Sequence, residues 1–393
     1  MSLLFRHVHP PLRLIPGRTY ASLPTSIKPK SAIYVSRSSN PFFNLTLEDW
    51  LFRHFPPHSP SLLLYRDSPC VIIGRNQNPW KEVNVTTARE RGVPWIRRRS
   101  GGGTVFHDLG NTNYSIHIPR MAFDRTKTAK VVVRAVRSLG VEAYANERND
   151  ICVGGNKISI LYARFIAFLA DGTYSSTYRH ISGSAYKIVS NRAYHHGTML
   201  ISTRLDVLGD LLRVDKPMMH TKGVASVRSP VCNLVGTNPY LTHEAFVKAV
   251  IHSFREEYGV DDEPCIVDET PEYTGDEYFQ IGMGELRSWD WAYGQTPEFE
   301  YTLERKFGWG DVISTIRSKH GIILSCSFAL SPASSTSPNI QMALSELGKR
   351  LEGKRYGFVL DAEVFVPSEC ALAEVAKSEV SDVWRWLKLE MSG

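Results

Sequence analysis

The stretch from residue 96 to residue 117 constrains the fold more than any other, because three consecutive arginines run through a serine into three consecutive glycines. Glycines tolerate positive φ and allow close backbone approach, so Gly101, Gly102 and Gly103 are expected to present a cradle of N–H groups. The preceding arginines carry guanidinium groups suited to carboxylates and phosphates. We therefore predict a strand, an anion-binding loop, a strand over Thr104–His107, a turn, and a strand over Asn113–Ile118.

Two better-known glycine patterns do not fit this loop. A P-loop ends in Gly-Lys-Ser/Thr, whereas Gly103 is followed by Thr104 and Val105. A dinucleotide-binding fingerprint needs a third glycine where this chain has Phe106. An arginine–glycine nucleic-acid patch is a third alternative, but the arginine run is not repeated and leads into strand-like sequence. From this motif alone, a glycine loop whose arginines are only solvated remains an alternative to an anion-binding loop.

The net charge of +6 is concentrated at the N-terminus. Residues 1–30 contain five arginines or lysines and no acidic residue, which leaves +1 for the remainder. This composition is typical of a mitochondrial transit peptide and predicts a protein of the mitochondrial matrix; a tail without a targeting role is the alternative. The near-neutral remainder gives no argument for nucleic acid or an anionic membrane, and no run reaches the roughly 18 apolar residues of a membrane span.

The six cysteines are scattered, with no Cys-x-x-Cys pair, and we expect free thiols in a reducing compartment. His195 and His196 are adjacent, and adjacent residues of a strand point to opposite faces. They are therefore poor joint metal ligands.

The 3,4-spacing of apolar residues predicts three helices: one capped by Asn44 and ending near His54, one opened by Asp124 or Thr126 and stopped by Gly140, and one from Thr242 to Gly259. Further expected elements are short strands over Leu62–Tyr65, Cys70–Gly74 and Ile151–Val153. The acidic, poorly patterned segment from Cys265 to Gly284 is predicted to be a linker. Beyond it, strands over Phe299–Phe307 and Val312–Phe328 and a helix over Ile340–Leu351 indicate a small α+β domain.

Several segments resemble the lipoate-protein ligases, and the resemblance extends over roughly residues 31 to 357. The match is almost residue for residue over 97–111 (RRRSGGGTVFHDLGN). Further similar segments are 69–80 (PCVIIGRNQNPW), 149–150 (ND), 157–159 (KIS), 183–186 (GSAY), 195–200 (HHGTML) and 288–297 (SWDWAYGQTP).

The resemblance, to a fungal-type mitochondrial member of the biotin/lipoate-protein-ligase superfamily, implies an α+β fold. It implies a mixed-sheet catalytic core with a small C-terminal α+β accessory domain. We expect a transit peptide over 1–30, a catalytic domain over 31–270 and the accessory domain over 285–393, in a monomer without a membrane span or nucleic-acid partner.

The family's activity is to convert lipoate with ATP and Mg²⁺ into lipoyl-AMP and to transfer the lipoyl group to one lysine of a lipoyl domain. The expected acceptors are mitochondrial 2-oxoacid dehydrogenase E2 subunits and the glycine-cleavage H protein. By resemblance, Lys157 is the catalytic residue and contacts both the lipoate carboxyl and the phosphate. The implied nucleotide contacts are Arg98, Ser100, Gly101, Gly102, Gly103, Thr104, Val105, Phe106, Asn149 and Asp150.

Asp150 is also the implied Mg²⁺ ligand. Lipoate is expected to contact Lys157, Gly102 and His196, and Trp50 or Trp80 would either line the acyl pocket or pack in the core. Two rival functions stay open. One is a lipoyl or octanoyl transferase that uses preformed acyl-AMP, acyl-CoA or another lipoyl protein, and the other is a non-catalytic module that binds biotin or lipoyl domains.

The sequence departs from the family between Ser159 and Gly183, where 23 extra residues interrupt a motif that otherwise continues without a gap. Removing residues 160–182 restores that motif, and the segment has a length of whole codons and splice-compatible ends. We interpret it as a translated, unspliced intron. We expect these residues to leave the sheet with few contacts to the core, because the insertion breaks a catalytic strand.

Overall fold

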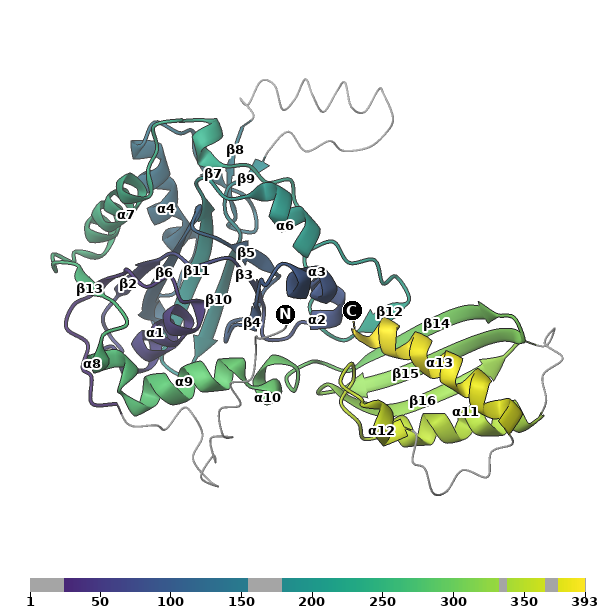
Figure 1. Cartoon of the computed structure of the whole chain (residues 1–393). Helices are drawn as coiled ribbons and strands as arrows, with labels where there is room; N and C mark the ends of the chain where they lie inside the picture. The colour runs from purple at the N-terminus through teal and green to yellow at the C-terminus, as the bar shows by residue number, and fades with distance from the viewer. Residues whose placement is uncertain (1–24, 155–178, 332–337, 365–373, 393) are drawn as a thin grey trace, which may run out of the picture. The chain divides into compact units, whose positions relative to one another are not determined.

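The computed structural model describes residues 25–154, 179–331, 338–364 and 374–392, and its elements are labelled in Figure 1. The chain forms two compact units, each assembled from three segments. The first unit contains residues 1–68, 108–203 and 230–288, and the second contains residues 69–107, 204–229 and 289–393. Within the described ranges, no helix is both long and apolar enough to cross a membrane.

The first unit is built on a mixed six-stranded sheet of order β10-β11-β6-β2-β1-β13, with a small sheet of order β7-β8-β9 beside it. β1 is parallel to β2 and β13, whereas β2–β6, β6–β11 and β10–β11 are antiparallel. The strands are β1 (Ile33–Ser36), β2 (Ser61–Tyr65), β6 (Asn111–Pro119), β7 (Ala143–Ala145), β8 (Ile151–Val153), β9 (Arg179–His180), β10 (Ser184–Val189), β11 (Arg192–Leu200) and β13 (Cys265–Val267). The helices are α1 (Pro41–His54), η2 (Arg120–Ala122), α4 (Arg125–Ser138), η3 (Leu234–Gly236), α7 (His243–Tyr258), α8 (Pro271–Thr274) and α9 (Glu277–Arg287).

Strand β2 shows why the large sheet is covered on both faces. Its leucines alternate sides, since successive strand residues point in opposite directions. Leu62 and Leu64 join the core formed with α4 and α7, whereas Leu63 joins the core formed with α1, α8 and α9. Figure 1 shows these two helix layers around the sheet. A strand buried on both faces reads as a continuous apolar run, as this one does.

The second unit contains an antiparallel sheet of order β12-β14-β15-β16 and a small sheet of order β4-β3-β5. Its strands are β3 (Cys70–Ile73), β4 (Trp95–Arg97), β5 (Val105–His107), β12 (Met219–Thr221), β14 (Phe299–Phe307), β15 (Gly310–Lys319) and β16 (Ile322–Leu330). Its helices are α2 (Pro79–Glu82), α3 (Val85–Glu90), α6 (Leu205–Leu211), α10 (Trp289–Ala292), α11 (Pro338–Leu351), α12 (Asp361–Val364) and α13 (Glu374–Ser392).

The helices predicted from apolar spacing are present, and their local signals act as expected. The Asp124 side chain accepts from the first amides of α4, and Thr242 caps α7, which ends at Gly259 in the left-handed conformation. The predicted strand–loop–strand–turn–strand series is confirmed as β4, a loop, β5, a turn and β6. The two flanking strands β5 and β6 belong to different sheets.

Two expectations about helices and linkers are wrong. Helix α1 begins one turn earlier than predicted, with Asn40 as its cap and Pro41 in the first position. Asn44 instead lies buried inside the helix, where its Nδ2 donates to Asp67 Oδ1 at 2.8 Å. The segment 265–284 is also not a linker, because it forms β13, α8 and much of α9 and buries Tyr278 and Phe279 completely.

The expectation for the insertion is wrong at its C-terminal end. Residues 160–178 lie outside the described residues, but Arg179 and His180 form β9 and pair with β8. Ile181 is fully buried in the main core of the first unit, and Ser182 is 1% exposed. These four residues are part of the fold, because Ile181 fills an apolar position that the sheet must cover.

Candidate functional site

The glycine-rich loop lies in the second unit between β4 and β5. Gly102 has φ +85°, a conformation that favours glycine. A Cβ added at Gly74 would lie 2.1 Å from the carbonyl oxygen of Gly102, so the two backbones touch. The amide of Arg75 also donates to the Ser100 carbonyl at 2.8 Å. The sequence 74–77 therefore supports the loop from one side.

Arg98 is buried and holds the loop from within. Its guanidinium donates to the carbonyl oxygens of Gly101 at 2.5 Å and Gly103 at 2.8 Å, and to Ser100 Oγ at 2.9 Å. A fourth bond reaches the Ile72 carbonyl at 3.2 Å. A planar fork with five donors can satisfy carbonyls on several sides at once. Arg98 therefore fixes the shape of the loop, and its predicted contact with a nucleotide stays a prediction.

Arg97 is fully buried and braces the neighbouring segment rather than the loop. It donates to the carbonyls of Arg75 at 2.8 Å and Gln77 at 2.7 Å, and to Thr296 Oγ1 at 3.0 Å. Burial, together with the charge of Arg75, lowers the pKa of Arg97 to about 9. The guanidinium of Arg99 stacks on Trp291 with its centre 4.8 Å from the ring centroid. The three arginines therefore bind carbonyl groups and an aromatic ring of the protein itself. The sequence pattern did not predict these contacts.

Thr104 ends the loop inside a hydrogen-bonded group of polar side chains. Its amide donates to Ser226 Oγ at 2.9 Å, and its hydroxyl donates to Gln77 Oε1 at 3.0 Å. Gln77 also accepts from the Gly74 amide at 2.8 Å, and Ser226 Oγ donates to Glu82. Sequence reasoning missed Gln77, Glu82 and Ser226. Gln77 stands in a polar segment that resembles the family, but no local pattern marks Ser226.

The first unit holds the predicted residues Asn149 and Asp150, which follow a tight turn. Asn149 has φ +62°, and Asn146 Oδ1 accepts from the Asp150 amide at 3.0 Å. The Asp150 carboxylate is buried and accepts from the Ser184 amide at 3.2 Å. His180 Nδ1 lies 3.8 Å from Asp150 Oδ2. The turn therefore presents this carboxylate to the start of β10.

His196 and Glu48 form a buried pair in the first unit. His196 Nδ1 lies 2.8 Å from Glu48 Oε1, which brings β11 and α1 together. Burial raises the pKa of Glu48, but the charge and hydrogen bond of His196 outweigh burial and hold the pKa below its ordinary value. His195 points to the opposite face and bonds to Thr128 Oγ1 at 2.7 Å. The prediction of opposite faces is confirmed, and contact of His196 with lipoate stays a prediction.

The remaining predicted residues fall into three groups. Trp50 and Trp80 are buried in apolar clusters of the first and second unit respectively, as the packing alternative expects. Val105 and Phe106 belong to β5, with Phe106 in the core of the second unit. Lys157, the expected catalytic residue, lies outside the described residues.

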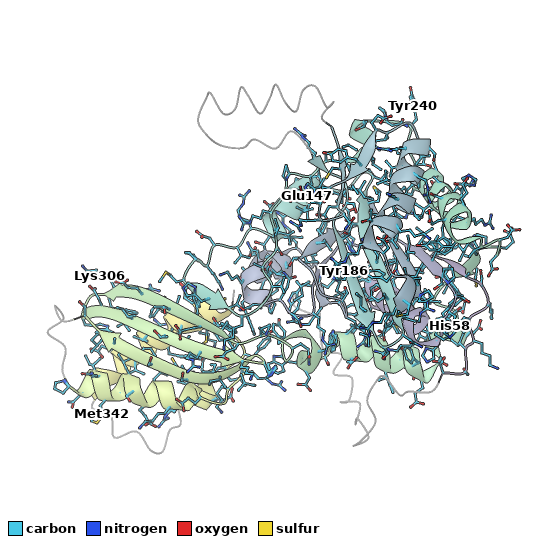
Figure 2. The ribbon with its side chains drawn as sticks, turned by 180° about the vertical axis from the view of Figure 1, so that it is seen from behind. His58, Glu147, Tyr186, Tyr240, Lys306 and Met342 are labelled. Carbon is cyan, nitrogen blue, oxygen red and sulfur yellow. The ribbon has the colours of Figure 1, made fainter. Side chains whose placement is uncertain are left out.

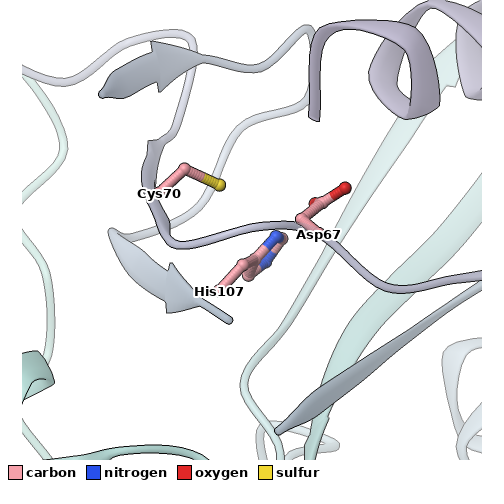
Figure 3. Close-up of side chains that lie close together, drawn as sticks. All are labelled: Asp67, Cys70 and His107. Carbon is pink, nitrogen blue, oxygen red and sulfur yellow. The ribbon is translucent and has the colours of Figure 1, made fainter. Parts of the chain in front are cut away.

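Figure 3 draws three polar or sulfur side chains from the segments before and after the glycine loop, Asp67, Cys70 and His107. Within the second unit, Cys70 and His107 are cross-strand partners at the ends of β3 and β5. Within the first unit, Asp67 is fully buried and accepts from Asn44 and Asn113. Both sets of contacts involve residues at or beside strand ends that flank the loop motif.

Comparison with known proteins decides the family. The model of the lipoyl protein ligase A/B catalytic domain matches residues 40–255. Lipoate-protein ligase A of Psychrobacter cryohalolentis is 37% identical over 289 residues, which cover 72% of this chain and 77% of that protein. The chain belongs to this family. The resemblance drawn from the sequence is confirmed, and the protein is an enzyme of the lipoate-protein ligase type.

Solved structures support the same α+β fold for this lipoate-protein ligase family member. LipL1 of P. falciparum, solved in complex with lipoate, has a TM-score of 0.55 at 24% identity and covers 91% of this chain and 98% of its own. A bi-partite lipoate protein ligase of Thermoplasma acidophilum has a TM-score of 0.51 at 22% identity and covers 71% of this chain and 100% of its own. At these identities the likeness shows the fold.

Proposed function

We propose that the protein activates lipoate with ATP to lipoyl-AMP and transfers the lipoyl group to a lysine of a lipoyl domain. The observation that carries this proposal is the braced loop of residues 98–104, whose shape is fixed by Arg98 and by the left-handed Gly102. Preorganised backbone N–H groups suit a phosphate, and they need no rearrangement as charge develops. Family membership supports the same chemistry.

The reaction has two steps. A lipoate carboxylate oxygen attacks the α-phosphorus of ATP, the bond to the β-phosphate breaks, and pyrophosphate leaves. The amine of the acceptor lysine then attacks the acyl carbon of this mixed anhydride, an amide forms, and AMP leaves. The first step requires two anionic groups, the carboxylate and the α-phosphate, to be held together, which positive charge and fixed donors make possible.

Residue roles in this proposal follow the family motif. By that motif, Lys157 contacts both the lipoate carboxylate and the phosphate, and the nucleotide contacts are Arg98, Ser100, Gly101, Gly102, Gly103, Thr104, Val105 and Phe106. By the same motif, Asn149 and Asp150 are nucleotide contacts, and His196 contacts lipoate. Asp150 offers a carboxylate suited to Mg²⁺, which is typically bound through one or two carboxylates plus substrate phosphates. Arg148 Nε lies 3.7 Å from that carboxylate, and its positive charge opposes a cation there.

The acceptor and compartment also belong to the proposal. LipL1 of P. falciparum was solved with lipoate, and the T. acidophilum ligase is paired with an E2 lipoyl domain in an archaeal lipoylation system. We infer that this protein modifies mitochondrial E2 subunits or the glycine-cleavage H protein. Residues 1–30 act as the transit peptide, which a reporter fused to these residues tests by its location in cells.

Lipoate-dependent ATP–pyrophosphate exchange tests the activation step, in the 393-residue chain and in the 370-residue form that lacks residues 160–182. We expect exchange in the shorter form and little or no exchange in the 393-residue chain. Lys157→Ala in that form should lower the rate by about 10²–10³, because it removes an electrostatic donor. Lys157→Arg should not rescue well, since a planar fork cannot replace a compact charge.

The exposed Lys130→Ala serves as the matched control. Near-normal exchange by Lys157→Ala would overturn the assignment of that residue. If the shorter form shows no exchange but transfers the acyl group from synthetic lipoyl-AMP, the enzyme is a transferase. If neither reaction occurs and a lipoyl domain still binds, the non-catalytic module is correct.

A further inference from the structure

The dipeptide Ile-Ser occurs both directly before the insertion and at its C-terminal end. Lys157-Ile158-Ser159 precedes the insertion, and His180-Ile181-Ser182 closes it. The two tripeptides are separated by 23 positions, which is also the length of the insertion. When residues 160–182 are absent, Ser159 joins directly to Gly183, so the first tripeptide must stand where the second stands now.

The structure shows that the second tripeptide is hydrogen-bonded into the fold, with His180 in β9 and with Ile181 and Ser182 between β9 and β10. The Ile181 amide donates to the Ile151 carbonyl at 3.0 Å, and the Ile181 carbonyl accepts from Leu200 at 2.9 Å. On the other side, the His180 amide donates to Pro230 at 2.9 Å. The segment therefore bonds to β8, to β11 and to the chain at Pro230, all within the first unit.

The segment contacts both the core and the Asp150 carboxylate. Ile181 points into the core and is fully buried. His180 and Ser184 both lie near the Asp150 carboxylate. His180 Nδ1 lies 3.8 Å from Asp150 Oδ2, and the Ser184 hydroxyl lies 3.4 Å from Asp150 Oδ1. Within the tripeptide, the side chain at position 180 thus lies beside the carboxylate.

We propose that His180-Ile181-Ser182 is a substitute for Lys157-Ile158-Ser159 in the same strand register, so that the 393-residue chain keeps its fold but places an imidazole where the 370-residue form places the lysine ammonium. Both tripeptides contain isoleucine followed by serine. The isoleucine that packs in the core and the serine beside Tyr114 are therefore the same residue types in both forms. The forms differ at one functional side chain. A lysine carries its charge on a flexible four-carbon stem, which the shorter imidazole ring does not reproduce.

This inference changes the expected cause of inactivity in the longer chain. A broken strand would remove the support for the catalytic residue, whereas a substituted strand leaves the support intact and supplies the wrong side chain. The structural part of the inference does not depend on the enzymatic activity. Its catalytic part rests on the proposed function.

Thermal unfolding tests the register. Ile181→Ala in the 393-residue chain and Ile158→Ala in the 370-residue form should lower the Tm equally, by roughly 5 °C, because each opens the same cavity. Ile188→Ala, at a site that is 41% exposed on β10, should leave the Tm of both forms nearly unchanged. An unchanged Tm for either buried-site variant would overturn the shared register.

Exchange activity tests the side chain. His180→Lys in the 393-residue chain should raise lipoate-dependent exchange at least about tenfold over its parent, out of the roughly 10²–10³ that such a charged donor supplies. His180→Gln, which adds no charge, should leave the rate at the parental level. If the 370-residue form is active and His180→Lys gains nothing, the inference fails while the proposed function stands. If the 370-residue form is itself inactive, the proposed function fails and the unfolding result still decides the register.

Discussion

Nδ1 of His196 on β11 lies 2.8 Å from Oε1 of Glu48 on α1, and both residues are buried. The preceding residue of the strand, His195, bonds to Thr128 of α4 on the other face. Two adjacent histidines thus link the sheet to a different helix on each side. Since both contacts involve groups that can titrate, they predict how the stability of the protein depends on pH.

Glu48→Gln should make the protein less sensitive to acid. The pKa of Glu48 is held below its ordinary value of 4.5, because the charge and hydrogen bond of His196 outweigh the effect of burial. A depressed carboxyl pKa stabilises the fold above about pH 4.5, and this stabilisation is lost as the pH falls through the folded-state pKa. Denaturant unfolding between pH 6 and 3 should show a smaller loss for the variant than for the parent. The exposed Glu142→Gln is the control, and an equal loss in all three proteins would contradict the prediction.

His195→Gln should flatten the pH dependence of stability between about pH 6.5 and pH 3. Burial lowers the pKa of His195 to about 3, whereas an unfolded chain binds the proton near pH 6.5. The unfolded state therefore binds more protons below pH 6.5, and stability falls as the pH falls, by up to about 1.4 kcal/mol per pH unit. Glutamine keeps a polar partner for Thr128 but cannot titrate, so that slope should shrink. His58→Gln, at the exposed position labelled in Figure 2, should keep the parental slope.

Arg98→Lys should weaken catalysis more than it alters the fold. Lysine cannot reach the carbonyls of Gly101 and Gly103 together, so the loop loses its fixed shape. Errors of about 1 Å in position can cost around 10²-fold in rate, and we expect a loss of that size in exchange activity of the 370-residue form. Arg91→Lys changes an exposed ion pair with Asp210 in the same unit and should have little effect. Similar rates for both variants would show that Arg98 does not shape the loop.

Gly102→Ala should be harmful while Gly101→Ala is tolerated. Gly102 has φ +85°, where an alanine costs roughly 1–2 kcal/mol, whereas a Cβ at Gly101 meets no atom within 4 Å. The strained variant should relax by moving its carbonyl, which touches Gly74. Comparing ATP affinity and the Tm of the two variants checks this expectation. Equal affinity in both would mean that the loop conformation does not matter for binding.

Caps, apolar spacing and glycine positions in the sequence predicted the helices whose ends depend only on nearby residues. The cap at Asp124, the apolar spacing of α4 and the left-handed end of α7 at Gly259 need no distant partner. Asn40 and Pro41 carried an equally local signal, a cap followed by proline, and it identifies the true start of α1 better than Asn44 does. The loop itself was located correctly because three glycines in a row have few other uses.

The roles of the arginines could not be predicted, because they depend on segments that are distant in sequence. Arg97 is buried only because Thr296 and the carbonyls of residues 75 and 77 surround it. The segment 265–284 folds for a similar reason, since Phe279 packs against Trp50 and Phe43 more than 200 residues earlier. Neither contact leaves a periodic pattern in the sequence.

The sheet β12-β14-β15-β16 contains one edge strand, β12, that comes from a much earlier part of the sequence than its other three strands. Met219–Thr221 pairs with β14, and Trp80 packs against Tyr293, Phe299 and Tyr356 in the core below. A gene fragment that begins at Trp289 would therefore encode a sheet with a bare edge and a core lacking one indole. Such a fragment would tend to aggregate through β14. Residues 289–393 therefore cannot be moved to another protein as one fragment, because β12 and Trp80 would stay behind. A single truncation before Trp289 would likewise leave β12 and Trp80 without their partners.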